Sequence, residues 1–192
     1  GGTLTATTAT LELGENVNIT SNNKLTFKEL DLSGYSLSLS SPTSDLTVSD
    51  TVTLSSSAEQ INAGSATLTL TGGMTMSGGT LETDGGTISL ASTSTVETDG
   101  TLDVSGGTLE LNADLTVTAT LKTDGDTTLT LNSNTIDFSG GSAASGGTLE
   151  VKEALTLDGI TFDDKTTIKL NDNTTLTSNA ALTVKTIEMG TH

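Results

Sequence analysis

The chain lacks cysteine, arginine and tryptophan, and each absence excludes a class of structure. Without cysteine, no disulfide can hold the fold together. Aromatic residues make up only 2% of the 192 residues, so a globular core built around large rings is not expected. There is a single proline, Pro42. This scarcity suits a chain of strands, because proline has no backbone N–H to donate to a β-ladder. The sequence is instead rich in Leu, Val, Ile, Thr, Ser and Gly, which favours narrow β-structure.

Positive charge is scarce as well. The net charge is -17, all seven basic residues are lysines, and none lies between Lys28 and Lys122. Nucleic acid is excluded as an expected partner because phosphate binding needs clustered Lys and Arg, and anionic lipid is disfavoured for the same reason. The chain also lacks a run of about 18 apolar residues, so no membrane insertion is predicted.

The feature that organises the sequence is a repeated pair of apolar residues separated by one outward residue. The first members of successive pairs are 21, 21, 22, 20, 21, 20, 20, 19 and 19 residues apart. The pairs are Leu4/Ala6, Leu25/Phe27, Leu46/Val48, Leu68/Leu70, Ile88/Leu90, Leu109/Leu111, Leu129/Leu131, Leu149/Val151, Ile168/Leu170 and Ile187/Met189. A period of this size is typical of a solenoid, in which each repeat buries its apolar face against its neighbours.

Each period carries three short apolar pairs, which predicts a coil with three faces. Segments such as Asp84-Gly85-Gly86-Thr87 and Ser105-Gly106-Gly107-Thr108 precede the repeated pair and are expected to form corners. We therefore predict an all-β fold, a parallel β-helix (β-solenoid) of about nine coils of 19–22 residues. The handedness of parallel crossovers favours a right-handed coil. A uniform repeat predicts one domain over residues 1–192, and we expect it to be a segment of a longer repeat protein.

Two stretches interrupt the pattern. In the third coil, Ser55-Ser56-Ser57 and Glu59-Gln60 are expected to bulge outward, which makes this the best candidate for a local insertion. The Gly- and Ser-rich stretch 139–147 is expected to form a weak third side, with Ala143-Ala144 facing inward.

No residue pattern indicates catalysis. The only histidine is His192, at the last position, where a frayed tail or cloning remnant is the expected interpretation. The motifs of serine hydrolases, zinc proteases and phosphate loops are missing. We therefore expect that the protein is not an enzyme and uses no cofactor.

Carboxylates at the corners are weak candidates for a calcium site, because Ca²⁺ binds several oxygen ligands. They are expected on or next to the corner between the second and third faces, with Asp84, Asp124 and Asp163 in equivalent places. However, Asp84 and Asp124 would lie two coils apart, about 10 Å by the usual strand spacing, so one ion could not bridge them. Solvated turn carboxylates are the alternative interpretation. The candidates are Asp84, Asp99, Asp124, Asp126 and Asp163, with Glu82, Glu97, Asp103 and Asp164 nearby.

The outward residues of the first face are rich in threonine, which predicts a possible binding face. Ranked threonines on a flat β-face are how several ice-binding solenoids order water. Charged residues such as Lys24, Asp45 and Glu110 interrupt the array. The alternative interpretation is that threonine occurs here only because it has a high propensity for exposed strand positions. The candidate residues are Thr3, Thr5, Thr7, Thr67, Thr69 and Thr71.

The Ser-Gly-Gly-Thr-Leu-Glu units at residues 77–82, 105–110 and 145–150, with Leu182-Thr183-Val184, carry a family resemblance. They resemble the passengers of bacterial autotransporters and of filamentous-haemagglutinin-type adhesins. The resemblance covers nearly all of the chain and implies a secreted or cell-surface right-handed β-helix. It implies no catalytic residues.

Two functions of different class follow as hypotheses. The first is an extracellular structural or adhesive rod. Its expected partner is either another copy of the chain, bound end to end, or the surface of a host or neighbouring cell. The alternative is an ice- or glycan-binding solenoid that uses the threonine-rich face. Because Leu4 and Ile187 are expected in the same phase, nine turns apart, we also expect the last apolar pair of one copy to stack on the first pair of another.

Overall fold

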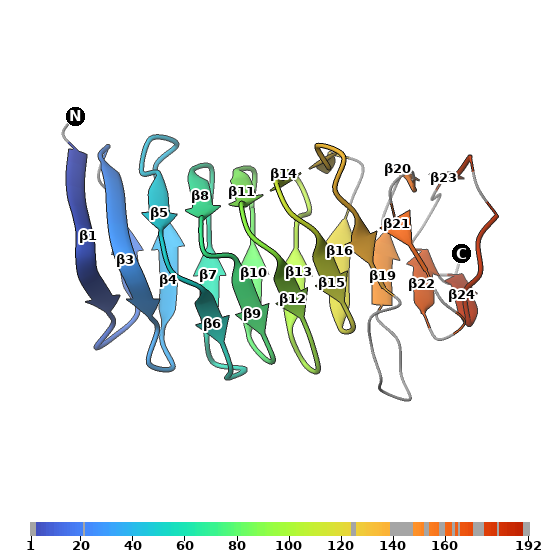
Figure 1. Ribbon diagram of the computed structural model, residues 1–192, viewed down its shortest axis with the longest axis horizontal. Coiled ribbons are helices and arrows are strands. Elements are labelled where there is room, and N and C mark those ends of the chain that lie inside the picture. The colour runs from blue at the N-terminus through green and yellow to red at the C-terminus, as the bar shows by residue number, and fades with distance from the viewer. Residues whose placement is uncertain are drawn as a thin grey trace.

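The protein is a rod of stacked β-coils with its two termini at opposite ends (Figure 1). The computed structural model describes residues 3–20, 22–123, 126–138, 148–151, 154–157, 160–162, 164, 166–170, 175–179 and 181–189. All regular elements among these residues are strands, and every strand pairing is parallel. The predicted all-β solenoid is therefore confirmed.

Three long sheets run along the rod and form its three faces. The first face contains seven strands: β1 (Thr3–Glu12), β3 (Lys24–Asp31), β5 (Leu46–Val48), β8 (Thr67–Leu70), β11 (Thr87–Leu90), β14 (Thr108–Leu111) and β17 (Thr128–Thr130). The second face contains six: β6 (Val52–Leu54), β9 (Met74–Met76), β12 (Ser94–Val96), β15 (Leu115–Val117), β18 (Ile136–Asp137) and β21 (Ile160–Thr161).

The third face is the longest and contains nine strands, which are separated by eight complete turns. They are β2 (Val17–Ile19), β4 (Ser36–Leu39), β7 (Gln60–Asn62), β10 (Thr80–Glu82), β13 (Thr101–Asp103), β16 (Thr120–Thr123), β19 (Thr148–Val151), β22 (Thr167–Leu170) and β24 (Thr186–Met189). A further pair, β20 (Ala154–Thr156) and β23 (Thr175–Thr177), forms a short separate sheet.

The predicted column of apolar pairs is correct for its first seven members and wrong for the last three. Leu4 pairs with Leu25, and the series continues along the first face to Leu129. Leu149 instead pairs with Leu121 on the third face, so Leu4 and Ile187 lie on different faces. The turn from Leu121 to Leu149 spans 28 residues (149 − 121), longer than the 19–22 expected. The extra residues are about as many as one face of a coil contains. Counting about 20 residues on from Leu129 therefore reaches a strand of the third face instead of the first.

The first two coils depart from the three-strand pattern. β1 and β3 are long strands that cover the first side and continue past it, with a register shift between Ala6 and Thr10. The sequence explains this, because no glycine or proline interrupts the chain between Thr3 and Leu13 or between Lys24 and Leu32. Without corner residues the backbone stays extended.

The core is a continuous stack of inward aliphatic side chains. Leu46, Leu68, Ile88 and Leu109 follow one another along the first face, and all four are fully buried. Burying one such side chain contributes roughly 1.5–3 kcal/mol. The stack also accepts aromatic rings, since Phe138 and Phe162 of neighbouring turns lie with ring centroids 5.3 Å apart and planes 18° from parallel.

The expected outward bulge at 55–60 is wrong for Glu59, which is buried. Its Oε2 accepts hydrogen bonds from the backbone N–H groups of Ser55 (2.7 Å) and Ser56 (3.1 Å), and its Oε1 accepts one from Gly34 of the preceding turn (3.3 Å). On the following turn, a Cβ at Gly79 (φ +73°) would lie 2.6 Å from the Glu59 carbonyl oxygen. The carboxylate therefore bonds the corner from inside, and the next turn packs directly against the backbone carbonyl of Glu59.

The described part of the chain contains no helix long and apolar enough to cross a bilayer.

Candidate functional site

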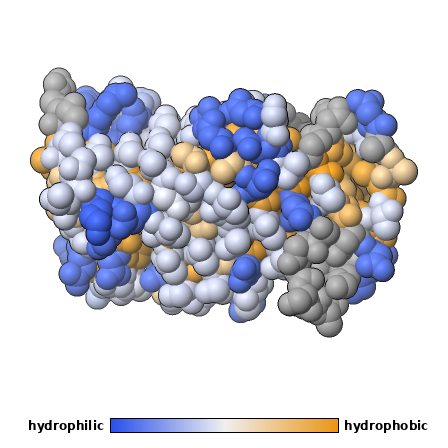
Figure 2. Space-filling view, viewed as in Figure 1, coloured by the Kyte–Doolittle hydropathy of each residue, from blue (hydrophilic) through white to orange (hydrophobic). Residues whose placement is uncertain are grey.

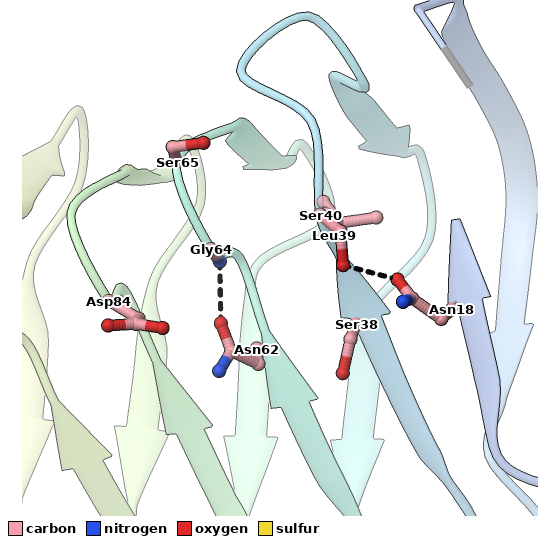
Figure 3. Close-up of a pocket in the computed structure, with 8 residues that line it drawn as sticks. All are labelled: Asn18, Ser38, Leu39, Ser40, Asn62, Gly64, Ser65 and Asp84. Carbon is pink, nitrogen blue, oxygen red and sulfur yellow. Dashed lines mark hydrogen bonds between the residues drawn. The ribbon is translucent and has the colours of Figure 1, made fainter. Parts of the chain in front are cut away.

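The nine-stranded face carries a polar groove in the N-terminal half of the rod. It has a volume of about 430 Å³. Figure 3 shows its lining residues, which come from the ends of successive strands of the third face and from the corners that follow them. They are Asn18, Ser38, Leu39, Ser40, Asn62, Gly64, Ser65 and Asp84.

The strand register builds this groove. Asn18 pairs with Ser38 and Ser38 pairs with Asn62, so three polar side chains share one outward column on β2, β4 and β7. Alternation along each strand points them to solvent while their neighbours enter the core. The short Ser and Asn side chains leave the groove open.

Hydrogen bonds fix the asparagine side chains in the groove (Figure 3). Ser40 Oγ donates to Asn18 Oδ1 at 2.5 Å, and the Gly64 N–H donates to Asn62 Oδ1 at 2.6 Å. Asp84 adds an exposed carboxylate on a corner with φ of 43°. The groove thus presents amide, hydroxyl and carboxylate groups, which suit a hydroxyl-rich ligand.

The next strands of the third face carry charge. Glu82 Oε1 accepts hydrogen bonds from Asn62 Nδ2 (2.6 Å) and Gln60 Nε2 (2.8 Å). Asp103 follows Glu82 in the column, and its Oδ2 lies 3.8 Å from Lys122 Nζ. The column then continues through Glu150, Lys169 and Glu188, so acidic and basic positions alternate from Lys122 onward. Opposite charges directly across a strand pair are stabilising, as for Asp103 and Lys122.

A second groove, of about 550 Å³, lies near the N-terminal end and is lined by Glu29, Ser49, Asp50, Thr51 and Gly72. Lys28 Nζ lies 2.7 Å from Glu29 Oε1 and 3.3 Å from Asp50 Oδ2. The hydrogen bond from Lys28, followed by that from Thr10, lowers the pKa of Glu29. The hydrogen bond to Glu29, followed by that to Asp50, raises the pKa of Lys28. This cluster ties adjacent coils together through charge.

The predicted calcium candidates do not converge. Asp84 and Asp126 lie at corners that lead from the third face to the first, whereas Asp99 lies at a corner that leads from the second face to the third. The expectation of one shared corner is therefore wrong for Asp84 and Asp126. Within the described ranges, no group of three His, Cys, Asp or Glu side chains could hold a metal ion. Asp124 and Asp163 lie outside the described residues.

The predicted threonine face is only partly assembled. Thr5, Thr26, Thr47 and Thr69 form one column of the first face, and Thr67 pairs with Thr87. Beside that column, Lys24 Nζ and Asp45 Oδ2 form an ion pair of 3.1 Å. Thr3 pairs with Lys24, Thr7 lies at the register shift of β1, and Thr71 follows β8. Charged side chains therefore interrupt the hydroxyl array.

Two features escaped the sequence prediction. One is Glu59, although strict alternation back from the inward Ile61 would have placed it inside. The other is a threonine column on the third face, where Thr80, Thr101, Thr120, Thr148, Thr167 and Thr186 occupy equivalent positions on six successive strands. The sequence prediction aligned the repeats only on the apolar pair of the first face. The 28-residue turn from Leu121 to Leu149 breaks the period of that alignment, so the threonine column could not be recognised.

Comparison of the chain with protein-family models, with curated proteins and with solved structures gave no match.

Proposed function

We propose that this chain is a non-catalytic structural rod that forms the shaft of an extracellular adhesive protein. The observation that carries the proposal is the nine-stranded parallel ladder of the third face, which runs through the chain without interruption. Eight steps at about 4.8 Å give that ladder a length of about 38 Å. Each inner coil is bonded to a coil on either side, so bending the rod would strain many hydrogen bonds at once.

The surface and the sequence agree with this role. A net charge of -17 keeps such rods apart from one another laterally. The resemblance of the Ser-Gly-Gly-Thr-Leu-Glu units to autotransporter passengers and filamentous-haemagglutinin-type adhesins supports a location outside a bacterial cell, at or beyond its surface. Adhesion to a host or neighbouring cell would then use the flanks or the ends of the rod.

Small-angle X-ray scattering on dilute protein, followed by limited proteolysis, tests the rod. We expect the profile of a rigid cylinder with a constant cross-section, and we expect a broad-specificity protease to leave the body from β3 to β16 intact. A flexible-chain profile, or early cleavage within these strands, would contradict the proposal. A single cysteine introduced near one end would attach the chain to beads, and retention of these beads on cell layers would test adhesion.

The second candidate is a glycan-binding solenoid, and the polar groove at Asn18, Ser38 and Asn62 favours it. A glycan array would show selective binding that is lost in Asn18→Ala combined with Ser38→Ala. The matched control is Thr116→Ala on β15, on another face. Ice binding through the first face has less support because Lys24 and Asp45 interrupt it, and an ice-recrystallisation assay would test it directly.

A further inference from the structure

Two Asp-Gly sequences lie at corners of the described part of the rod, at residues 84–85 and 99–100. Asp84 and Asp99 are both exposed, so the two sites look alike in the sequence and at the surface. In the inner coils, turns from the third face to the first lie along the upper rim in Figure 1, and turns from the second face to the third lie along the lower rim. Figure 2 shows strongly hydrophilic patches along both rims, so water reaches these corners.

The two glycines occupy different positions in their turns. The first corner is closed by a hydrogen bond from the Gly86 N–H to the Thr83 carbonyl oxygen (3.0 Å), which leaves Gly85 in the middle of the turn. Gly85 is exposed, and its N–H has no hydrogen-bond acceptor among the residues that the structure describes. The second corner is instead closed by the Gly100 N–H, which donates to the Glu97 carbonyl oxygen at 2.9 Å.

Packing around the two glycines differs in the same direction. A Cβ added to Gly85 would meet no atom within 4 Å, whereas Gly100 is buried and a Cβ there would lie 3.1 Å from the Cβ of Met76 in the preceding turn. Asp84 also has a φ of 43°, in the left-handed region that non-glycine residues rarely adopt. The first corner therefore has the open space, the free N–H and the backbone strain that favour a rearrangement, and the second has neither the space nor the free N–H.

We propose that Asp84 converts spontaneously to isoaspartate in the folded protein, and that the fold protects Asp99. The backbone nitrogen of Gly85 attacks Cγ of the protonated Asp84 carboxyl group, and one water molecule leaves, made of the N–H proton and the carboxyl OH. Water then opens the resulting five-membered succinimide at the α-carbonyl, which breaks the bond of that carbonyl to the Gly85 nitrogen. The chain now runs through Cγ, the α-carboxylate becomes the side group, and no oxidant or other reactant is needed.

The reaction requires a backbone nitrogen that is free to lose its proton and to reach Cγ of the aspartate. Glycine has no Cβ that could hinder this approach. At Gly100 the nitrogen is held by its hydrogen bond and the residue is buried, so this corner must open before the ring can form. The need to break one such hydrogen bond makes the reactive state roughly tenfold rarer.

The modification would change the polar groove, which Asp84 lines beside Asn62 and Gly64 (Figure 3). Isoaspartate adds one carbon atom to the backbone of this corner. Gly86 is buried, and a Cβ there would lie 2.5 Å from the Gly64 carbonyl oxygen, so the added length cannot be taken up inward. The corner must therefore extend outward, and the carboxylate of the groove moves with it. The site depends on neither the proposed rod nor glycan binding, since it needs only the folded corner.

Timed incubation of the whole chain at neutral pH, followed by peptide mapping, tests the proposal. The aged protein is unfolded and cut after glutamate, which places Asp84 in the peptide 83–97 and Asp99 in the peptide 98–110. An isoaspartyl peptide keeps its mass but changes its chromatographic retention, and a protease that cleaves before aspartate no longer cuts it at that residue. We expect isoaspartate to accumulate roughly ten times faster at Asp84 than at Asp99.

Two controls separate the effect of the fold from that of the sequence. In denaturant the two corners no longer differ, so both sites should isomerise at similar rates. Asp84→Glu keeps the charge but would need a larger ring, so it should abolish the signal at this position and leave Asp99 unchanged. Equal rates at the two sites in the folded protein, a faster rate at Asp99, or no isoaspartate at Asp84 after the unfolded chain has reacted would overturn the proposal.

Discussion

Two strands with nearly the same sequence pattern, β11 and β24, differ completely in burial. β11 reads Thr-Ile-Ser-Leu and β24 reads Thr-Ile-Glu-Met, and both alternate polar and apolar residues. Ile88 and Leu90 are fully buried, whereas Ile187 is 48% and Met189 66% exposed. β11 lies between β8 and β14, but β24 has only β22 beside it. Burial in this fold is therefore decided by a neighbouring coil and not by the residues of the strand.

The comparison implies that stability is unequal along the rod. In a solenoid, the free energy is close to a sum of repeat terms and nearest-neighbour interface terms. Inner coils have two such interfaces and the end coils have one. The same substitution should thus cost more in the middle than at the end.

The largest expected effect is at the core of β11. Ile88→Ala should lower the free energy of unfolding by about 2–5 kcal/mol, as is usual for large-to-small changes in a packed core. Ile187→Ala, at the second residue of β24 as Ile88 is of β11, should cost well below that, because nearly half of Ile187 is already exposed to water. Urea unfolding of dilute monomer gives both values, and equal costs would contradict the dependence on neighbouring coils.

The second-largest loss of stability is expected on substitution of Glu59, the carboxylate inside the corner. Glu59→Ala leaves three partly buried backbone N–H groups without their acceptor. A fully buried unsatisfied donor costs about 1–3 kcal/mol, so each of these partly buried donors should cost less than that. Thermal melting should show a large fall in the midpoint for Glu59→Ala and a smaller one for Glu59→Gln, which keeps an oxygen acceptor. Glu97→Ala at an exposed corner is the matched control and should change little. A similar shift in that control would mean that Glu59 acts only through net charge.

The smallest effect is expected at the exposed cluster of Lys28, Glu29 and Asp50. Lys28→Met removes the main cause of the lowered pKa of Glu29, so that pKa should return toward its usual value of 4.5. Carboxyl chemical shifts followed by NMR during a pH titration measure the change. Lys24→Met, which breaks the ion pair with Asp45, should leave Glu29 unchanged.

The direction of the pH dependence follows from these shifts. The contribution of Glu29 to stability is complete above its usual pKa and is lost as the pH falls through its lowered pKa in the folded state. The contribution of Lys28 is complete below its usual pKa of 10.5 and is lost as the pH rises through its raised value. The stability difference between wild type and Lys28→Met should therefore be constant between these limits. A difference that persists at strongly acidic pH would contradict the pairing.

Much of the fold could be predicted because the rungs of a solenoid repeat at a nearly constant spacing. The column from Leu4 to Leu129 is one example, and its seven members lie on one face as expected. The prediction failed after Leu129 because a residue count cannot distinguish a new coil from an insertion that is one face long. The burial of Glu59 was missed because a charged side chain is expected at the surface. That expectation was given more weight than the alternation along the strand, which places Glu59 inside. The groove at Asn18, Ser38 and Asn62 depends on which residues of neighbouring coils pair side by side. The sequence of a single coil does not determine that register.

The 28-residue turn between Leu121 and Leu149 has an evolutionary consequence. The strands on either side of it pair in register, so the ladder tolerates extra residues between rungs. Corners of this fold can therefore gain or lose segments while the scaffold is inherited unchanged. A lineage could acquire a new recognition loop in a single step at such a corner, and a protein engineer could graft one there in the same way.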